Sequence, residues 1–355
     1  MATDYWTRVA MQRLSRRRSL SALGAGATGA ALLAACGGND SAGDSGSKDT
    51  SGLLSETVDD FKSAKRTAAI KAVHFADQQN MDPMFTSLPN QLPVNSCYTQ
   101  FWGFTGGYMK PSAGEIQGDN AEAWEFSADK LTLTIKLSDK AHFAPVAPTN
   151  GRVVDADDVV FSFNRFKEQG TRRSDLINAV NPDAPISSLT KIDSRTVQIK
   201  LAMPFPGLEY LATNTQAGYM FIVPKEAADL NVLDLRRQGN GSGPWYLSDY
   251  TPSVGYTFKR NPGFKQDKRG DLPYADEFTA PIVPEYANQL AQFRAGAIYT
   301  MSSSGVAIRA EDILPAKKDI PELSLTLSNL SSTSARNFFG ALPESPFKDV
   351  RVRQA

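Results

Sequence analysis

Four residues of this 355-residue chain carry the side chains most often used as metal ligands or as nucleophile and base pairs: Cys36, Cys97, His74 and His142. They are far apart in the sequence, and no two have the short spacing that is typical of a zinc site. Two cysteines are also too few for a disulfide scaffold. We therefore expect neither a metal site nor a cofactor.

A serine-based enzyme is the first alternative that the residues suggest. Gly43-Asp44-Ser45-Gly46 resembles the nucleophile loop of serine proteases, but it lies in a polar, Gly- and Ser-rich stretch. A strained catalytic loop needs a rigid scaffold, which such a stretch does not supply. A base would have to be His74 or His142. His74 lies in an apolar segment, which favours a structural role, so we expect no enzyme.

Cys36 follows Leu33-Ala34-Ala35, which closely resembles the lipobox of bacterial lipoproteins. The resemblance implies that the Cys36 thiol receives a diacylglyceryl group and becomes the first residue of the mature chain. Two acyl chains give durable membrane anchoring. Cys97 would then have no partner, and we expect it to be a buried free thiol.

Residues 1–35 have the pattern of a cleaved export signal, with a basic region before an uncharged run of small residues. A transmembrane helix is the alternative, but Gly24, Gly26 and Gly29 make the run a poor anchor. Ser15–Leu20 contains Arg16-Arg17-Arg18 and resembles a twin-arginine signal. Ser19 stands where that signal favours Phe, so general secretory export stays open.

Residues 36–60 are predicted to hold the lipidated Cys36 and a flexible linker, because residues 37–52 contain a single apolar side chain. The chain after residue 35 has 33 basic and 37 acidic residues. Nucleic acids require a clustered positive field, so this balance argues against them as partners.

The folded body combines strand and helix patterns. Alternating apolar residues predict strands at 131–137, 196–201 and 323–327, a first strand at 70–76, and a hairpin over 245–260. A helix is expected after Asp155, with Val159, Val160, Phe163 and Phe166 on one face, and another over 285–295 before Gly296. Such a mixture indicates an α/β fold.

Two clusters have a structural and a functional interpretation. Asp155, Asp157 and Asp158 could hold a metal, but a helix start explains them better. The glycines of residues 239–243 could cradle a phosphate, but no Gly-Lys-Ser/Thr follows them. We expect these glycines to allow a tight turn with positive φ.

From about residue 66 to residue 355, several segments in order resemble solute-binding protein family 5 of the ABC importers. The segments are Ala121–Trp124, Asp155–Arg165, Gly239–Trp245, Arg260–Phe264 and Ser345–Ala355. Each motif alone is weak, and their order behind a lipobox and linker makes the resemblance specific.

The resemblance implies a two-lobed type II periplasmic-binding-protein fold with an inserted subdomain. The expected parts are the signal 1–35, the linker 36–60, lobe I in 61–95 and 205–335, the insertion in 96–204, and the start of lobe II in 336–355. Relatives continue further, so we expect the second lobe to be largely absent through C-terminal truncation. A naturally short relative is the alternative.

The implied function is capture of a small solute outside the cytoplasm and delivery to an ABC permease with its ATPase subunits. Peptides are the first expectation, and nickel complexes or other small solutes the second. Asn90, Asn95 and Tyr98 are the candidate hydrogen-bond donors to the ligand, and Trp102 and Trp245 the candidate stacking surfaces. Core packing is the alternative for both tryptophans. The rival functions are a lipid-anchored envelope hydrolase and an adhesive or structural lipoprotein.

Overall fold

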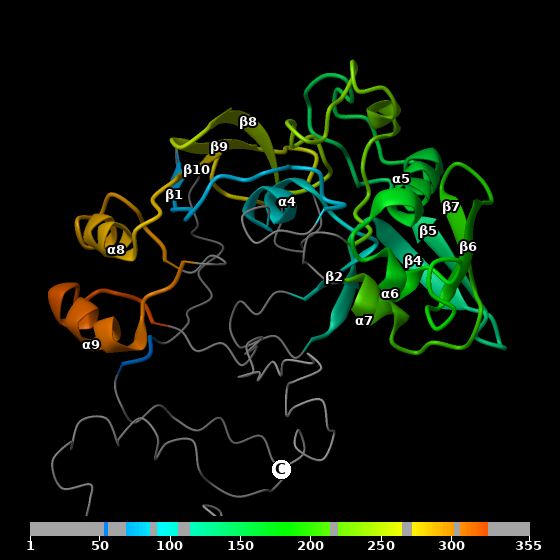
Figure 1. Ribbon diagram of the computed structural model, residues 1–355, viewed down its shortest axis with the longest axis horizontal. Helices are drawn as coiled ribbons and strands as arrows, with labels where there is room; N and C mark the ends of the chain where they lie inside the picture. Colours follow the sequence, from blue (N-terminus) through cyan, green and yellow to red (C-terminus); the bar gives the residue numbers. More distant parts are fainter. Residues whose placement is uncertain are drawn as a thin grey trace, which may run out of the picture. The chain divides into compact units, whose positions relative to one another are not determined.

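The computed structural model describes residues 53–55, 69–85, 91–105, 114–213, 219–264, 272–301 and 306–325 (Figure 1). These residues belong to one compact unit that spans Gly52–Ala355. The predicted signal, Cys36, most of the linker, Asn90 and the expected start of lobe II lie outside the described residues.

One four-stranded sheet is assembled from distant parts of the chain. Its strands, in order, are β1 (Ile70–Lys71), β10 (Glu277–Pro281), β9 (Gly255–Arg260) and β8 (Trp245–Thr251). β8 and β9 form the predicted hairpin, with Tyr256 and Phe258 buried. β1 pairs with β10 in parallel and is shorter than the predicted 70–76. The pairing continues only as an isolated bridge between His74 and Ile282.

A second sheet is fully antiparallel and comes from one continuous stretch. Its order is β4 (Ala121–Phe126), β5 (Thr132–Leu137), β7 (Thr196–Leu201) and β6 (Ile186–Lys191). β5 and β7 confirm the predicted alternation, because every second side chain of each strand is buried. This sheet therefore has one face on the core and one towards solvent.

Helix α5 (Ala156–Gln169) packs against this second sheet and begins where its sequence predicts. The Asp155 side chain accepts hydrogen bonds from the backbone N–H groups of Asp157 (2.9 Å) and Asp158 (3.1 Å). The Asp158 carboxylate accepts in return from the Asp155 N–H at 2.9 Å, which completes a capping box. Val159, Phe163 and Phe166 are buried.

The remaining elements are short. They are α4 (Gln91–Cys97), β2 (Trp102–Phe104), β3 (Ile116–Gly118), α6 (Arg173–Leu176), α7 (Leu208–Ala212), η2 (Lys225–Ala228), α8 (Tyr286–Arg294) and α9 (Ala310–Asp319). α4 packs against β8 (Figure 1). α8 ends before Gly296 at a φ of 69°, as predicted. Within the described ranges, none of the helices has the length and apolar character needed to span a bilayer.

The strand predicted at 323–327 is wrong for residues 323–325, which follow α9 without joining a sheet. The Lys317 Nζ donates to the carbonyl oxygens of Pro321 (2.8 Å) and Leu323 (2.6 Å). These bonds hold the segment against the end of the helix. Leu325 contacts Ser55 instead of a strand, through Ser55 N–H to Leu325 O at 2.8 Å.

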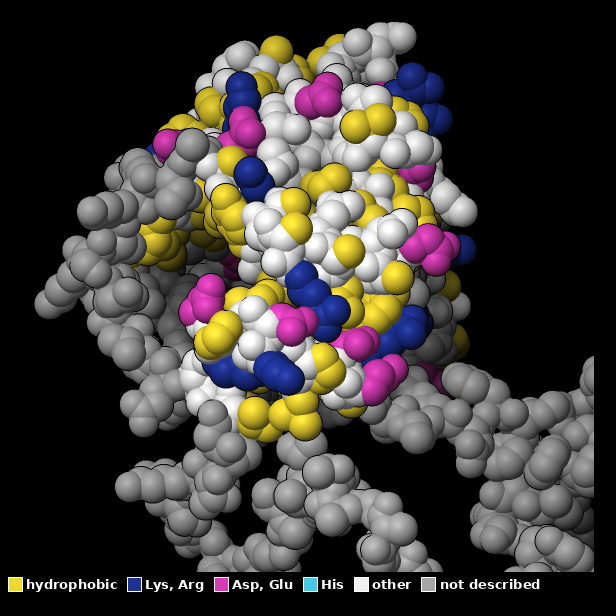
Figure 2. Space-filling view, turned by 90° about the vertical axis from the view of Figure 1, so that its left-hand side faces the viewer, with side chains coloured by type: hydrophobic (Ala, Val, Ile, Leu, Met, Phe, Trp, Pro, Cys, Tyr) yellow, Lys and Arg dark blue, Asp and Glu magenta, His cyan; other side chains and the backbone are white. Residues whose placement is uncertain are grey.

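The face that carries α8 and α9 has no field of one sign. Figure 2 shows basic and acidic side chains interspersed there among apolar ones.

Candidate functional site

The ligand-contact residues predicted from the sequence occupy different environments. Asn95 is exposed on α4, whereas Tyr98 and Trp102 are buried, at 3 % and 1 % exposure. The Tyr98 hydroxyl donates to the Gln238 carbonyl oxygen at 2.9 Å. The Trp102 ring contacts the edge of Trp124, with 5.8 Å between ring centroids.

Trp245 begins β8 and is half-buried, with its ring 5.8 Å from that of Phe278. Both tryptophans therefore have the packing contacts that the core interpretation requires. Ligand contact by Asn90, Asn95, Tyr98, Trp102 and Trp245 stays a prediction.

The glycine-rich loop 239–243 lies directly on the C-terminal end of α4. A Cβ at Gly241 would lie 2.1 Å from the Cys97 carbonyl oxygen, and one at Gly243 would lie 2.6 Å from the Ser96 carbonyl oxygen. None of the three glycines has a positive φ. The prediction of a positive-φ turn is therefore wrong, and these glycines serve close approach of backbone to backbone.

Cys97 lies in this contact and is a buried free thiol, as predicted. Burial raises the pKa of the Cys97 thiol far above its usual value. The neutral thiol is therefore the form present at physiological pH, and it acts as a small apolar group.

The aspartates at the start of α5 pair with cations of the protein itself. Asp158 receives two bonds of 2.7 Å from Arg152, which also binds Glu226. Lys225 Nζ lies 2.7 Å from Asp155. Among the described residues no group of three or more metal-ligating side chains is found. The helix-start interpretation is the one that the contacts support.

The two histidines differ in their surroundings. His74 is buried and its ring packs against Phe75 and Tyr256. His142 is half-buried, and its Nδ1 lies 2.9 Å from the Gly151 carbonyl oxygen. That bond ties His142 to the loop that follows it, which is a structural use.

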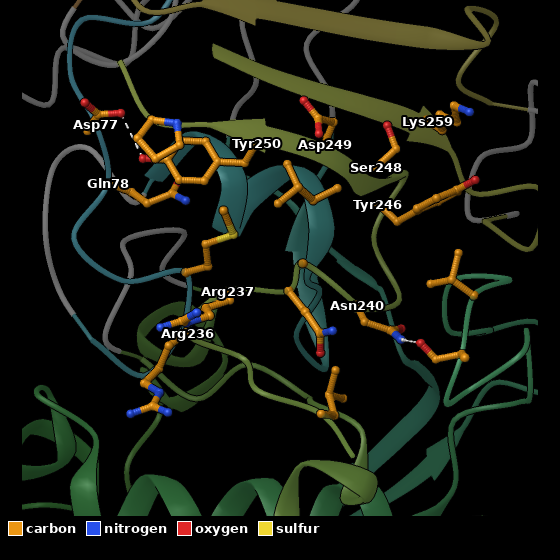
Figure 3. Close-up of a pocket in the computed structure, with 18 of the residues that line it drawn as sticks. Asp77, Gln78, Arg236, Arg237, Asn240, Tyr246, Ser248, Asp249, Tyr250 and Lys259 are labelled. Carbon is orange, nitrogen blue, oxygen red and sulfur yellow. Dashed lines mark hydrogen bonds between the residues drawn. The ribbon is translucent and has the colours of Figure 1, made fainter. Parts of the chain in front are cut away.

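A cavity of about 1080 Å³ lies beside β8, with residues 246–250 in its lining (Figure 3). Four separate segments surround it: the chain after β1, the loop before residue 151, the loop before β8, and the hairpin of β8 and β9. The charged and aromatic side chains that line it are Asp77, Arg236, Arg237, Tyr246, Asp249, Tyr250 and Lys259.

At one end of the cavity, Asp77 holds the hairpin turn. Its carboxylate accepts from the Ser253 backbone N–H at 2.8 Å, the Tyr250 hydroxyl at 2.8 Å and the Ser253 hydroxyl at 3.0 Å. The Ser253 N–H bond is the main cause that lowers the pKa of Asp77. The pKa of Tyr250 is raised to about 12. Burial is the largest cause, and the hydrogen bond to the Asp77 carboxylate is the second.

Arg236 and Arg237 line the cavity opposite β8 (Figure 3), and both lie close to the carboxylate of Asp234. Asp234 accepts from Arg236 Nε at 2.7 Å and from its Nη2 at 2.8 Å. Arg237 Nε is 3.9 Å from Asp234, and its side chain is 86 % exposed. Arg237 therefore keeps most of its hydrogen-bonding capacity.

The loop 144–150, which contributes Val146 and Ala147 to the cavity lining, is held by a polar side-chain link. Thr149 Oγ1 donates to Asn240 Oδ1 at 3.0 Å, and Asn240 Nδ2 donates to the Ala147 carbonyl oxygen at 3.3 Å. This link joins the loop 144–150 to the glycine-rich loop, so these two segments of the cavity lining are held together.

Of the ligand-contact residues predicted from the sequence, the four that the structure describes, Asn95, Tyr98, Trp102 and Trp245, do not line this cavity. The sequence did not indicate this cavity, because the cavity is lined by residues more than 150 positions apart, such as Asp77 and Asp249. The only local signal is the adjacent pair Arg236-Arg237, which by itself is typical of any exposed loop.

The comparisons with known proteins identify the family. The family model of bacterial extracellular solute-binding proteins, family 5 Middle, matches residues 115–355. The chain belongs to this family.

The relatives that it matches are binding and transport proteins. The dipeptide-binding protein of Escherichia coli K12 is 28% identical over 268 residues, which is 70% of this chain and 46% of that protein. The peptide transport periplasmic protein SapA of Salmonella typhimurium is 29% identical over 241 residues, covering 62% of this chain and 40% of that protein. The chain spans about half the length of the curated relatives it matches.

Solved structures confirm the predicted fold class. The periplasmic binding protein DppA of Helicobacter pylori, in complex with the peptide STSA, matches with a TM-score of 0.56 and 21% identity, over 67% of this chain and 47% of that one. HbpA2 of Haemophilus parasuis matches with a TM-score of 0.57 and 22% identity, over 71% of this chain and 50% of that one. The α/β fold is that of the type II periplasmic binding proteins.

Proposed function

We propose that this protein is the extracytoplasmic solute receptor of an ABC importer, with peptides as its solute. The observation that carries the proposal is the family match over residues 115–355, joined by relatives named for dipeptide and peptide binding. The proposed partners are a membrane permease and its ATPase subunits. Nickel complexes and other small solutes are the second class of ligand.

The proposed mechanism is binding without chemistry. In a two-lobed receptor, a ligand favours the closed form only by the difference between its affinities for the closed and open states. Backbone hydrogen bonds and end charges would hold an extended peptide without regard to its side chains. Neither a cofactor nor a metal is part of this mechanism.

Peptide capture is tested on the full chain by native mass spectrometry and calorimetric titration with a mixed peptide pool. We expect co-purified or added peptides to bind. An empty protein that hydrolyses ester or peptide reporters would instead support an envelope hydrolase. An empty protein with neither property would support an adhesive or structural lipoprotein.

We further propose that Cys36 carries a diacylglyceryl group that anchors the protein to the outer face of the cell membrane. The support is the sequence Leu33-Ala34-Ala35-Cys36 ahead of a polar linker. Cys36→Ala should move the exported protein from the membrane fraction to the soluble one. Ser45→Ala, in the same linker, is the control and should stay with the membrane. A Cys36→Ala variant that remains membrane-bound would contradict the anchor.

A further inference from the structure

The charges around the cavity beside β8 balance each other. The basic and acidic side chains of its lining are Arg236, Arg237, Lys259, Asp77 and Asp249. Asp234 is outside the lining and pairs with Arg236, so the cavity has as many acids as bases around it. Figure 3 shows Asp249 and Lys259 on the β8 side and both arginines opposite. An ionic group would meet like charge as well as opposite charge here, whereas a neutral ligand avoids that repulsion.

Three polar groups of the lining are not used by the fold. The buried Oε1 atom of Gln78 has no hydrogen-bond partner among the described residues. Lys259 and Asp249 are exposed and form no ion pair within the described part of the chain, and Asp249 receives one long side-chain bond of 3.4 Å from Thr251. Gln78 Oε1 and Asp249 accept hydrogen bonds, whereas Lys259 only donates them. A ligand that satisfies all three needs groups that both donate and accept, as hydroxyl groups do.

Tyr246 adds an aromatic surface to these polar groups. It is half-buried and lines the cavity, and among the residues that the structure describes its ring has no aromatic contact and its hydroxyl no hydrogen bond. Tyr250, by contrast, stacks on Tyr256 with 4.9 Å between ring centroids, and its hydroxyl is bound to Asp77. Tyr246 therefore suits a ligand ring with an apolar C–H face and a polar rim, and a pyranose sugar has both.

The size of the cavity favours more than one sugar ring. Its volume of about 1080 Å³ is slightly above the range of about 300–1000 Å³ that is usual for small-molecule sites. The lining runs along β8 from Tyr246 to Tyr250, which is about 13 Å at a rise of about 3.3 Å per residue. Gln78 lies at the Tyr250 end (Figure 3). A ligand that reaches from Tyr246 to Gln78 is therefore longer than a single sugar.

We propose that this cavity binds a short neutral oligosaccharide, with one ring stacked on Tyr246 and with hydroxyl groups bonded to Lys259, Asp249 and Gln78. The site does not depend on the transport function, because its ligand belongs to another chemical class than peptides. A peptide receptor would carry it as a second site.

The test uses the full chain and tetrasaccharides of different linkage and charge. Maltotetraose, cellotetraose and tetra-N-acetylchitotetraose are neutral, whereas tetragalacturonate is anionic and deacetylated chitotetraose is cationic. Calorimetry and saturation-transfer NMR of the sugar measure binding. We expect at least one neutral tetrasaccharide to bind with a dissociation constant of about 1 mM or below, and both charged ones to bind less tightly. Weaker binding of every neutral one, or tighter binding of a charged one, would overturn the proposal.

Matched variants locate the bound sugar. Tyr246→Ala removes the stacking surface and should weaken binding about three- to tenfold, whereas Tyr246→Phe keeps the ring and should stay within about twofold of the parent. Asp249→Asn keeps an accepting oxygen and should bind more tightly than Asp249→Ala. Tyr299→Ala, at an exposed tyrosine outside the cavity, is the control and should behave like the parent.

Sugar binding that is unchanged in Tyr246→Ala would overturn this site and leave the receptor function intact. A peptide titration of the parent and of Tyr246→Ala shows separately whether the receptor function fails. Peptide affinity should be the same in both proteins, because the two ligands have different sites. A peptide affinity that falls together with the sugar affinity would overturn the second site.

Discussion

Gly241 shows how one missing Cβ holds two segments together. Its Cα lies so close to α4 that a methyl group would meet the Cys97 carbonyl carbon and oxygen at 2.9 and 2.1 Å. The neighbouring Gly243 N–H donates to the same Cys97 oxygen at 2.8 Å. The loop that forms one wall of the cavity therefore depends on this contact.

Gly241→Ala should lower the free energy of unfolding by about 1–3 kcal/mol, because the backbone must shift to remove the overlap. Gly103→Ala is the matched control, since a Cβ there meets nothing within 4 Å. The control should change stability by no more than about 0.5 kcal/mol. Urea unfolding of both variants measures the difference, and equal midpoints would contradict the close-approach explanation.

Asp77 links the chain after β1 to the hairpin turn, and its lowered pKa gives this link a pH dependence. The folded pKa is below the usual 3.8, so the stabilisation is complete above that value and is lost as the pH falls through the folded pKa. Asp77→Asn should therefore be less stable than the parent at pH 7, by about 1 kcal/mol.

The difference between parent and Asp77→Asn should shrink between pH 4 and the acid limit of folding, because the parent carboxylate becomes protonated. Urea midpoints at pH 7, 5 and 3.5 test this trend. Asp139→Asn, at an exposed aspartate, is the control. A difference that stays constant with pH would show that the charge of Asp77 is not what stabilises the turn.

At the scale of elements, α5 is fixed mainly at its first turn. Asp155 caps two backbone N–H groups and pairs with Lys225 on η2, so one side chain both starts the helix and connects it to the next segment. Burial is the largest single influence on the pKa of Asp155 and raises it. The hydrogen bond with Lys225 comes second and lowers it, and together with the remaining favourable contacts it leaves the pKa of Asp155 below its usual value.

Asp155→Ala should destabilise the protein by about 0.5–2 kcal/mol, the usual cost of a lost N-cap. Asp155→Asn keeps an accepting oxygen for the cap and loses only the partly exposed ion pair. It should therefore cost less than about 1 kcal/mol. Thermal unfolding by circular dichroism compares the two variants, and equal losses would assign the effect to charge instead of capping.

At the scale of the whole described unit, a buried ion pair joins the two sheet regions. Arg165 on α5 binds both carboxylate oxygens of Asp82, whose side chain is 1 % exposed. Asp82 also accepts from the Met84 backbone N–H at 3.1 Å. The segment after β1 is thereby held to the helix that covers the other sheet.

Arg165→Met should destabilise the protein by about 3–5 kcal/mol, because it leaves Asp82 charged and buried without its partner. The double variant Asp82→Asn with Arg165→Met removes the charge and should recover part of that loss. Chemical unfolding of the single and double variants measures the coupling. A double variant less stable than Arg165→Met would contradict the buried-charge explanation.

The sequence by itself determined the elements whose signals are local. The Asp155 cap and the apolar stripe behind it specify α5, the alternation in 132–137 and 196–201 specifies β5 and β7, and Gly296 marks the end of α8. Capping, side-chain periodicity and turn chemistry act over a few residues, so they can be read from adjacent positions. The ordered family motifs likewise indicated the fold class that the structural comparisons confirm.

Only the tertiary structure decided which of these residues meet. It placed Tyr98 and Trp102 in the core, made the glycines of 239–243 serve close packing instead of positive φ, and gathered Asp77, Arg237 and Lys259 around one cavity. Such contacts join residues separated by tens to hundreds of positions. They depend on how sheets and loops close in space, and no local periodicity records that closure.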